Sequence, residues 1–312
     1  MINYSIIIPH YNTPDLLERC LKSIPQRKDV QVIVVDDNSP GNECYLTTIG
    51  ELSRPGIEYY VTTDGKGAGH ARNIGLSYAK GKWIIFADSD DFFVENFSVM
   101  LNEYIDDSND LVYFNIRVCD CYDTTKEYCS GKEILFKRYE LTGDDMCFRI
   151  SYTEPWGKLI KHKLLVDNEI TFQETRANND LLFSIKTGVL AKTVRIDKRP
   201  LYWYVIRMGS LGHQNKPEPY EKITDRVRAW NSTQLFLNSQ KIMTSFYLPV
   251  IPCIPLIRRD KIMYFRIISF MKKEKIKYRL VIYDTIKHLI TKILRGQGFV
   301  KVNDIVYNIK KS

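Results

Sequence analysis

Short, uninterrupted apolar runs in the first third of the chain place the tightest limits on its fold. Four such runs span residues 5–9, 30–35, 57–62 and 82–87. Segments with helical spacing separate them at 14–23, 43–52 and 71–79. A strand that is apolar on both faces is typical of a parallel sheet covered by helices on both sides. The alternation therefore predicts an α/β protein with a mostly parallel sheet.

Polar residues follow three of these predicted strands, in the segments 9–12, 36–39 and 88–91. In open parallel sheets, ligands bind beyond the carboxyl ends of the strands. We therefore expect the three polar segments to meet in one crevice, which would be the functional site.

The third polar segment is an acidic turn formed by Asp88, Ser89, Asp90 and Asp91. Three carboxylates within four residues repel one another, and a hard cation such as Mg²⁺ or Mn²⁺ relieves that repulsion and prefers oxygen ligands. Such a cation also neutralises a departing diphosphate. The alternative is a solvated turn that caps the next helix. The strand before the turn and the polar ends of the other strands favour the metal site.

Two other segments suit a nucleotide. Asp37 follows the second strand, where a carboxylate can accept a hydrogen bond from a uracil N–H or a ribose hydroxyl, although Asp, Asn and Ser also form ordinary turns. The glycine-rich loop 65–69 allows backbone amides to approach a phosphate, but it matches neither a P-loop nor a dinucleotide fingerprint. Arg72, just after it, suits a phosphate or one of the acidic turns.

The second half of the chain is less regular. Strands are predicted at 111–118, 193–196 and 201–205, and helices at 161–166, at 178–190 and in long segments from 220 onward. Asp180 opens the helix at 178–190. A carboxylate there can take a proton from an acceptor hydroxyl, but the spacing alone equally suits a helix N-cap.

Charge is divided unevenly along the chain. Residues 258–312 contain 15 Lys and Arg against 4 Asp and Glu, whereas residues 1–257 contain 30 against 33. Basic and apolar residues are mixed at helical spacing in 264–273 and 278–294, which predicts amphipathic helices that lie on an anionic membrane surface. The alternatives are a helical cap on the body and a self-association surface that would make a homo-oligomer. No nucleic-acid recognition motif accompanies the basic tail.

The seven cysteines form no C-x-x-C pair, and the N-terminus lacks the features of a secretory signal. Reduced thiols in a cytoplasmic protein are the expectation. No run of about 18 apolar residues predicts a spanning helix. The expected location is the cytoplasm, or the inner face of a bacterial plasma membrane as a peripheral protein.

Ordered motifs between residues 3 and 212 resemble family 2 of the inverting glycosyltransferases, which have the GT-A fold. The matching segments are 5–12, 32–39, 69–76, 82–91, 155–159, 179–183 and 202–210. The resemblance implies a GT-A nucleotide-diphospho-sugar transferase domain at 1–219, with a mixed, mostly parallel Rossmann-like sheet. A helical basic extension would follow at 220–312.

The resemblance also implies a set of roles for individual residues. A UDP-linked sugar would be the donor, and Mn²⁺ or Mg²⁺ the cofactor. The uridine pocket would be lined by Pro9, Tyr11, Asn12 and Asp37, with Arg72 nearby. In the same nucleotide-sugar site, Asp88 would face the ribose or sugar next to Ser89. The metal would be held by Asp90 or Asp91. Asp180 would be the general base, and the acceptor side would include Trp156, Lys158 and Asn179.

Two positions depart from the family pattern. Asn179 stands where a glutamate is common, and His10 stands where a small or apolar residue is usual. The implied function is transfer of a hexosyl or N-acetylhexosaminyl group to a hydroxyl of a glycan or lipid-linked acceptor during synthesis of a bacterial surface polysaccharide. The alternative is a non-catalytic nucleotide-sugar-binding or nucleic-acid-binding protein.

Overall fold

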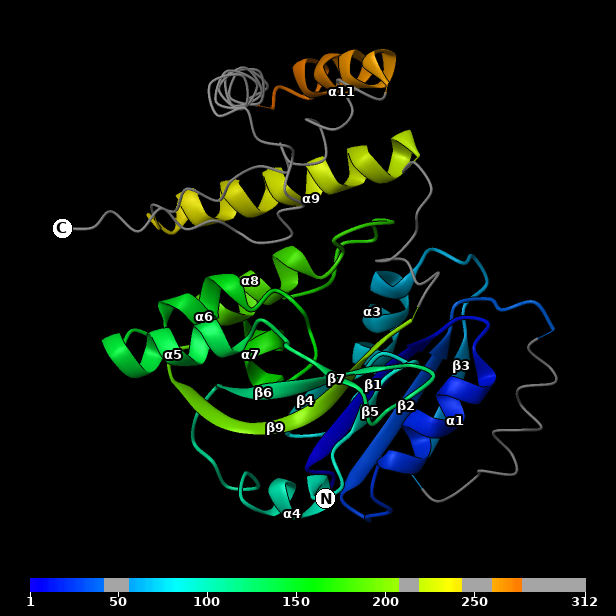
Figure 1. Cartoon of the computed structure of the whole chain (residues 1–312), viewed down its shortest axis with the longest axis vertical. Helices are drawn as coiled ribbons and strands as arrows, with labels where there is room; N and C mark the ends of the chain where they lie inside the picture. Colours follow the sequence, from blue (N-terminus) through cyan, green and yellow to red (C-terminus); the bar gives the residue numbers. More distant parts are fainter. Residues whose placement is uncertain (42–55, 208–218, 243–259, 277–312) are drawn as a thin grey trace. The chain divides into compact units, whose positions relative to one another are not determined.

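The computed structural model describes residues 1–41, 56–207, 219–242 and 260–276 (Figure 1). Three expectations lie outside these residues: the helix at 43–52, the end of the motif at 208–210, and the amphipathic segment at 278–294.

A single mixed sheet organises the described part of the first 207 residues (Figure 1). Its strands are β1 (Tyr4–His10), β2 (Val30–Asp36), β3 (Ile57–Val61), β4 (Trp83–Phe86), β5 (Phe92–Phe93), β6 (Leu111–Asp120), β7 (Glu127–Tyr128), β8 (Lys158–Lys161) and β9 (Val194–Ile206). The order across the sheet is β3-β2-β1-β4-β8-β6-β9-β5, and β7 pairs with β6.

The first four strands in this order, β3, β2, β1 and β4, are parallel. β1 lies between β2 and β4, so that Ile7 is opposite both Ile33 and Phe86. Each of these side chains is at most 1% exposed, as expected for strands covered on both faces. The alternation of apolar strands and helices thus predicted this half of the sheet correctly.

The described helices up to residue 207 are α1 (Pro14–Ser23), α3 (Ala68–Tyr78), α4 (Phe97–Asn102), α5 (Glu133–Thr142), α6 (Met146–Ser151), α7 (His162–Asp167) and α8 (Leu181–Leu190). α3 packs on β1 and β2. Gly75 allows this close approach, because a Cβ at that position would run into the Ile7 side chain.

The second half of the sheet differs from the sequence expectation in two ways. The strands β5, β7 and β8 were not predicted, and β8 runs antiparallel between β4 and β6. The strands expected at 193–196 and 201–205 form one long strand, β9, which runs parallel to β6. The register between them shifts around Asn115, and such an irregularity lets one strand continue where a simple pattern suggests two.

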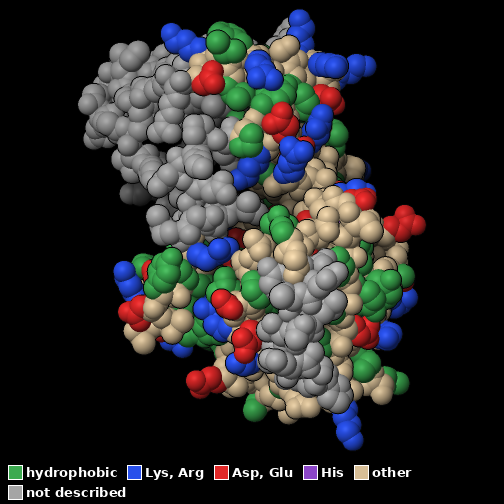
Figure 2. All heavy atoms as spheres, turned by 90° about the vertical axis from the view of Figure 1, so that its right-hand side faces the viewer, with side chains coloured by type: hydrophobic (Ala, Val, Ile, Leu, Met, Phe, Trp, Pro, Cys, Tyr) green, Lys and Arg blue, Asp and Glu red, His purple; other side chains and the backbone are tan. Residues whose placement is uncertain are grey.

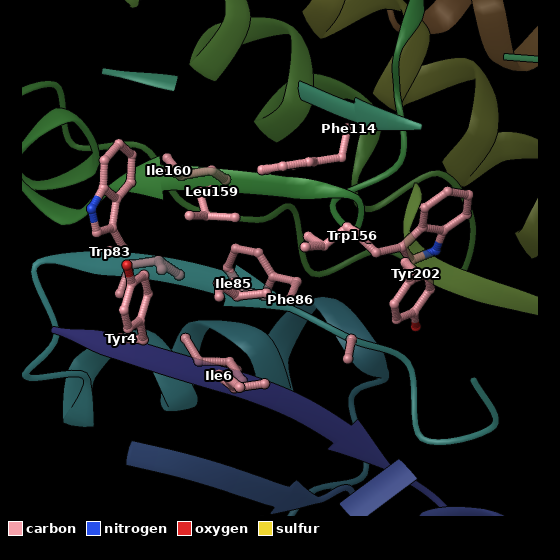
Figure 3. Close-up of a cluster of buried hydrophobic side chains, with 14 of the residues drawn as sticks. Tyr4, Ile6, Trp83, Ile85, Phe86, Phe114, Trp156, Leu159, Ile160 and Tyr202 are labelled. Atoms are coloured by element: carbon pink, nitrogen blue, oxygen red, sulfur yellow. The ribbon is translucent and has the colours of Figure 1, made fainter. Parts of the chain in front are cut away.

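Large apolar side chains from both halves of the sheet form one core. Figure 3 shows Tyr4 and Ile6 of β1, Ile85 and Phe86 of β4, and Leu159 and Ile160 of β8. At one end of this core, Trp156 stacks on Tyr202 with ring centroids 5.6 Å apart. The core therefore joins the parallel strands to the later antiparallel ones.

Among the described residues after the sheet, two segments are helical: α9 (Tyr220–Ser239) and α11 (Lys261–Lys273). Contacts divide the chain into Met1–Thr244 and Ser245–Ser312, and α9 lies in the first of these units. It packs on α8, and its buried residues include Ile223 and Val227. None of the described helices is long and apolar enough to cross a bilayer.

Candidate active site

The three polar segments lie at the ends of the adjacent strands β2, β1 and β4. Backbone N–H of Asn12 donates to Ser39 Oγ over 2.8 Å, and the hydroxyls of Thr13 and Ser89 are 3.4 Å apart. Asn12 has a φ of 49°, a left-handed conformation that Asn adopts more readily than most residues. The expectation that the three segments meet is confirmed.

A buried network fixes the end of β2. His10 Nδ1 lies 2.6 Å from Asp36 Oδ2, and Ser39 donates to Asp36 from both its N–H and its hydroxyl. Burial alone would raise the pKa of Asp36, but the hydrogen bonds from His10 and Ser39 lower it below its ordinary value. His10 therefore supports the turn through Asp36.

The expected uridine residues occupy different environments. Pro9 is buried in β1, whereas Tyr11 is 56% exposed. Asp37 accepts hydrogen bonds from Gly67 N–H at 2.7 Å and from the Thr62 hydroxyl at 3.2 Å. Asp37 thus ties the end of β2 to the glycine-rich loop that leads into α3.

The acidic turn is anchored through Asp91. This side chain accepts hydrogen bonds from the Tyr202 hydroxyl at 2.8 Å and from Val205 N–H at 2.7 Å. The same Tyr202 oxygen accepts from Asp88 N–H at 2.8 Å. Asp91 is only 1% exposed, and burial raises the pKa of its carboxyl well above the ordinary value. Both of its carboxylate oxygens therefore serve the fold.

Asp88 and Asp90 are the accessible carboxylates of the turn, with side chains that are 31% and 27% exposed. Arg19 donates to the backbone oxygen of Asp90 over 2.6 Å, and Arg207 approaches its carboxylate at 3.5 Å. Burial and the nearby charge of Asp88 raise the pKa of Asp90. No group of three His, Cys, Asp or Glu arranged to hold a metal occurs among the described residues.

Arg72 connects the acidic turn to the second half of the site. One end of its guanidinium donates to Asp88 Oδ1 over 2.6 Å, and the other donates to Asn179 Oδ1 over 3.0 Å. The guanidinium also lies over the Phe172 ring, 5.3 Å from its centroid. Arg72 thus brings the residue next to Asp180 to the end of β4.

Asp180 directly precedes α8, but its side chain does not cap that helix. Its side chain is half-buried. Burial raises the pKa of Asp180 to about 6, although Arg72 lowers it. A carboxylate in this state can accept a proton near neutral pH. The helix-cap alternative suggested by the spacing is therefore not what the structure shows.

The residues expected on the acceptor side form a buried support. Lys158 is 1% exposed, and its ammonium donates to the backbone oxygens of Tyr152 and Glu154 at 2.7 and 2.6 Å. Burial lowers the pKa of Lys158 to about 7. Trp156 stacks between Tyr202 and Tyr204. Lys158 therefore fixes the loop that carries Glu154 and Trp156.

Sequence reasoning missed Arg19 and the anchoring role of Tyr202. Arg19 lies on α1, far from any acidic motif in the sequence, and no local pattern marks it. Tyr202 was part of a recognised motif, but its contact with Asp91 spans 111 residues of chain. Only the pairing of β5 with β9 brings the two residues together.

The profile of the family described as "Glycosyl transferase family 2" matches residues 5–166, which include all three polar segments. The chain belongs to glycosyltransferase family 2. It shares 28% identity over 218 residues with glycosyltransferase GlyG of Streptococcus pneumoniae, covering 66% of this chain and 72% of GlyG.

Two other relatives are much longer than the matched segment. Poly(ribitol-phosphate) beta-N-acetylglucosaminyltransferase TarS of Staphylococcus aureus is 25% identical over 218 residues, which cover 66% of this chain and 36% of TarS. GlyA of S. pneumoniae is 27% identical over 229 residues, which cover 66% of this chain and 31% of GlyA. The match thus spans about a third of these two relatives.

Solved structures support the same fold. Residues 1–349 of S. aureus TarS in complex with UDP-GlcNAc give a TM-score of 0.62 at 18% identity, covering 96% of this chain and 93% of that one. Mannosyltransferase PcManGT of Pyrobaculum calidifontis, with GDP-Man and Mn²⁺, gives 0.53 at 15% identity, covering 95% and 76%. These structural matches show that the chain has a GT-A fold.

The Tyr202 anchor can be tested by Tyr202→Phe. This change removes a buried donor to Asp91 and a buried acceptor from Asp88, and we expect the free energy of unfolding to fall by about 1–3 kcal/mol. Urea denaturation provides the measurement. The control is Tyr128→Phe, which removes an exposed contact with Asp120 and should change stability by less than about 0.5 kcal/mol. Equal losses in the two variants would contradict the anchor.

Proposed function

We propose that this protein transfers a hexosyl or N-acetylhexosaminyl group from a UDP-linked donor to a hydroxyl of a glycan or lipid-linked acceptor, with inversion, during synthesis of a bacterial surface glycopolymer. Family membership supports the reaction class. The choice of UDP is supported by the TarS complex with UDP-GlcNAc. The acceptor class is supported by similarity to enzymes that glycosylate poly(ribitol-phosphate).

The observation that carries this proposal is the bridge from Arg72 to Asp88 and Asn179. It joins the end of β4, where the donor would bind, to the residue next to Asp180. In single displacement, the base must lie on the acceptor side of the anomeric carbon and deprotonate the attacking hydroxyl. Asp180 suits that role because burial raises its pKa to about 6, near the working range, and its side chain is not engaged in capping α8.

The donor side would be formed by residues at the ends of β1, β2 and β4. Asp37 and Asn12 would contact the uridine, next to the exposed ring of Tyr11. Asp88 and Ser89 would face the ribose or sugar. This placement uses the strand ends that the sheet brings together, in line with the general location of ligands in α/β sheets.

The accessible carboxylates suit Mn²⁺ or Mg²⁺. Such ions commonly bind one or two carboxylates, with substrate phosphates and water completing the shell. The raised pKa of Asp90, caused by burial and by Asp88, indicates crowded negative charge that a cation would relieve. We therefore propose Asp90 as the metal ligand, with Asp91 as its buried support. A bound cation would stabilise the charge of the UDP leaving group.

We further propose that α11 contacts an anionic membrane surface, where lipid-linked acceptors occur. Ile262 and Phe265 are 76% and 65% exposed, and the exposed residues around them include Lys261, Lys272 and Lys273. Figure 2 shows Lys and Arg side chains among hydrophobic ones over α11. Exposed apolar and basic residues on one helix are typical of interfacial binding.

Replacement of Asp180 tests the base. Asp180→Asn should lower kcat for transfer at least about 100-fold, the lower range for general base catalysis, while the Kd for UDP stays unchanged. In the unaltered protein, kcat should fall as pH drops below about 6, because the carboxylate becomes protonated. Steady-state transfer assays across pH and calorimetric titration with UDP give both results.

The stability of this variant is its internal control. Because the pKa of Asp180 is raised from 3.8 to about 6 in the folded state, the free energy of unfolding falls as pH rises from about 4 to about 6, and the full penalty remains at higher pH. Asp180→Asn should therefore melt at the same or a higher temperature at neutral pH. Transfer that survives in a folded, UDP-binding Asp180→Asn variant would contradict the assignment of the base.

The metal site is tested by calorimetric titration of UDP with Mn²⁺ and with EDTA. We expect Mn²⁺ to tighten binding at least about tenfold, equivalent to about 1.4 kcal/mol. Asp90→Asn should abolish this difference without lowering the melting temperature, whereas Asp91→Asn should lower the melting temperature, because both Asp91 oxygens hold the turn. Equal UDP affinity in Mn²⁺ and EDTA would rule out the metal site.

Membrane contact is tested by co-sedimentation with vesicles of phosphatidylglycerol and phosphatidylcholine, compared with pure phosphatidylcholine. Binding should require the anionic lipid, weaken with salt, and fall in the double variant Ile262→Ser, Phe265→Ser. Leu235→Ser is the control, because Leu235 is a similarly exposed apolar residue on α9. Equal binding to both vesicle types would refute this contact, and vesicle-independent sedimentation would indicate self-association.

A further inference from the structure

The segment between α7 and α8, residues 170–180, carries Asp180 at its end and contains no helix or strand. Its internal hydrogen bonds include one from Gln173 N–H to the Asn179 backbone oxygen at 3.2 Å and one from the Thr175 hydroxyl to the Ala177 oxygen at 3.0 Å. A few contacts of this kind give the segment a shape but do not locate it relative to the sheet. Its position therefore depends on the elements around it.

α3 supplies that external support through three residues of its first half, His70, Arg72 and Asn73. Asn73 makes two hydrogen bonds with the backbone of Phe172, donating from Nδ2 to the oxygen at 3.0 Å and accepting from the N–H at 2.8 Å. Arg72 donates to Asn179, and His70 Nδ1 lies 2.8 Å from Glu174 Oε1. The start of α3 thus holds the beginning, the middle and the end of the segment.

Close backbone packing reinforces these contacts. A Cβ on Gly69 would collide with the backbone oxygen of Gln173 and would lie 2.9 Å from Asn179 Cβ. The Phe172 ring is buried, stacking on Phe183 at 3.8 Å and meeting Phe86 edge-on at 5.0 Å. The segment therefore rests against α3 with no room for an added methyl group.

The same helix also contacts the donor side. Gly67 N–H, just before α3, donates to Asp37, and Arg72 pairs with Asp88. α3 is in turn packed on β1 and β2. One rigid element thus contacts both the residues that would hold the nucleotide-sugar and the segment that ends in Asp180.

We propose that Asn73 and Gly69 are positioning residues for Asp180: through them, α3 sets the place of the base relative to the donor site. This inference rests on the proposed role of Asp180. The two residues touch neither substrate nor the reacting atoms. The Asn73 side chain binds the backbone of Phe172. The lack of a side chain at Gly69 lets Gln173 and Asn179 pack closely against α3. A misplacement of about 1 Å can lower a rate about 100-fold, so this support matters for catalysis.

The test compares Asn73→Ala and Gly69→Ala with Ser77→Ala, an exposed change on the same helix. Asn73→Ala removes both hydrogen bonds to Phe172, and Gly69→Ala pushes the segment away from α3. Each variant is assayed for kcat, for the donor KM, for UDP binding by calorimetry and for the pH dependence of kcat. Rates are expressed per UDP-binding site, so that unfolded protein does not count.

We expect both site variants to lower kcat by about 10- to 100-fold, while the Kd for UDP and the donor KM change by less than about twofold. Because a loosened segment admits water to Asp180, the fall in kcat on the acid side should move to lower pH than the value of about 6 in the unaltered protein. Ser77→Ala should match the unaltered protein in every measurement.

Other outcomes overturn the inference. A lower melting temperature with an unchanged kcat per binding site would show that Asn73 and Gly69 serve only stability. A loss of UDP affinity greater than the loss of kcat would show that α3 acts on the donor. Asp180→Asn is assayed in parallel: if it still transfers sugar, the proposed base is wrong, whereas its inactivity together with normal rates in both α3 variants refutes only the positioning role.

Discussion

The paired contacts of Arg72 are the interaction on which the site depends most. A buried guanidinium is costly unless it is paired. The Arg72 side chain is 6% exposed, and its Nη1 and Nη2 donate to Asn179 and Asp88, although its Nε has no hydrogen-bond partner among the described residues. Those partners come from the end of β4 and from the segment before α8. The pairing of one cation with both therefore fixes the distance between the two halves of the site.

The acidic residues near the strand ends divide according to their hydrogen-bond donors. Asp36 and Asp91 accept several hydrogen bonds and are buried, so their carboxyl groups support turns. Burial raises the pKa of Asp90 and Asp180, as it does that of Asp91, but the carboxyl groups of Asp90 and Asp180 have fewer donors. Carboxyl groups that all lie near the end of a strand or precede a helix thus differ in their hydrogen bonding and pKa, because their burial and their neighbouring donors differ.

The family profile covers only part of the residues that form the candidate site. The family profile ends at residue 166, but Asp180 and the anchor Tyr202 lie beyond it. α9 contributes to the same unit by packing on α8, and its Asp225 accepts a hydrogen bond from Arg176 N–H in the segment before Asp180. The elements that follow the family core therefore help to hold the region in which we place the base.

The sequence alone determined the parallel half of the sheet, because apolar runs and helical spacing are local properties, and it determined that polar segments end those strands. Its ordered motifs also indicated the family and placed Asp180 before a helix. Only the tertiary structure decided that β8 lies antiparallel inside the sheet, that Asp91 is held by Tyr202, and that Lys158 is buried against the loop that carries Glu154 and Trp156. Each of these depends on residues distant in the chain, whose burial and hydrogen bonds no local pattern encodes.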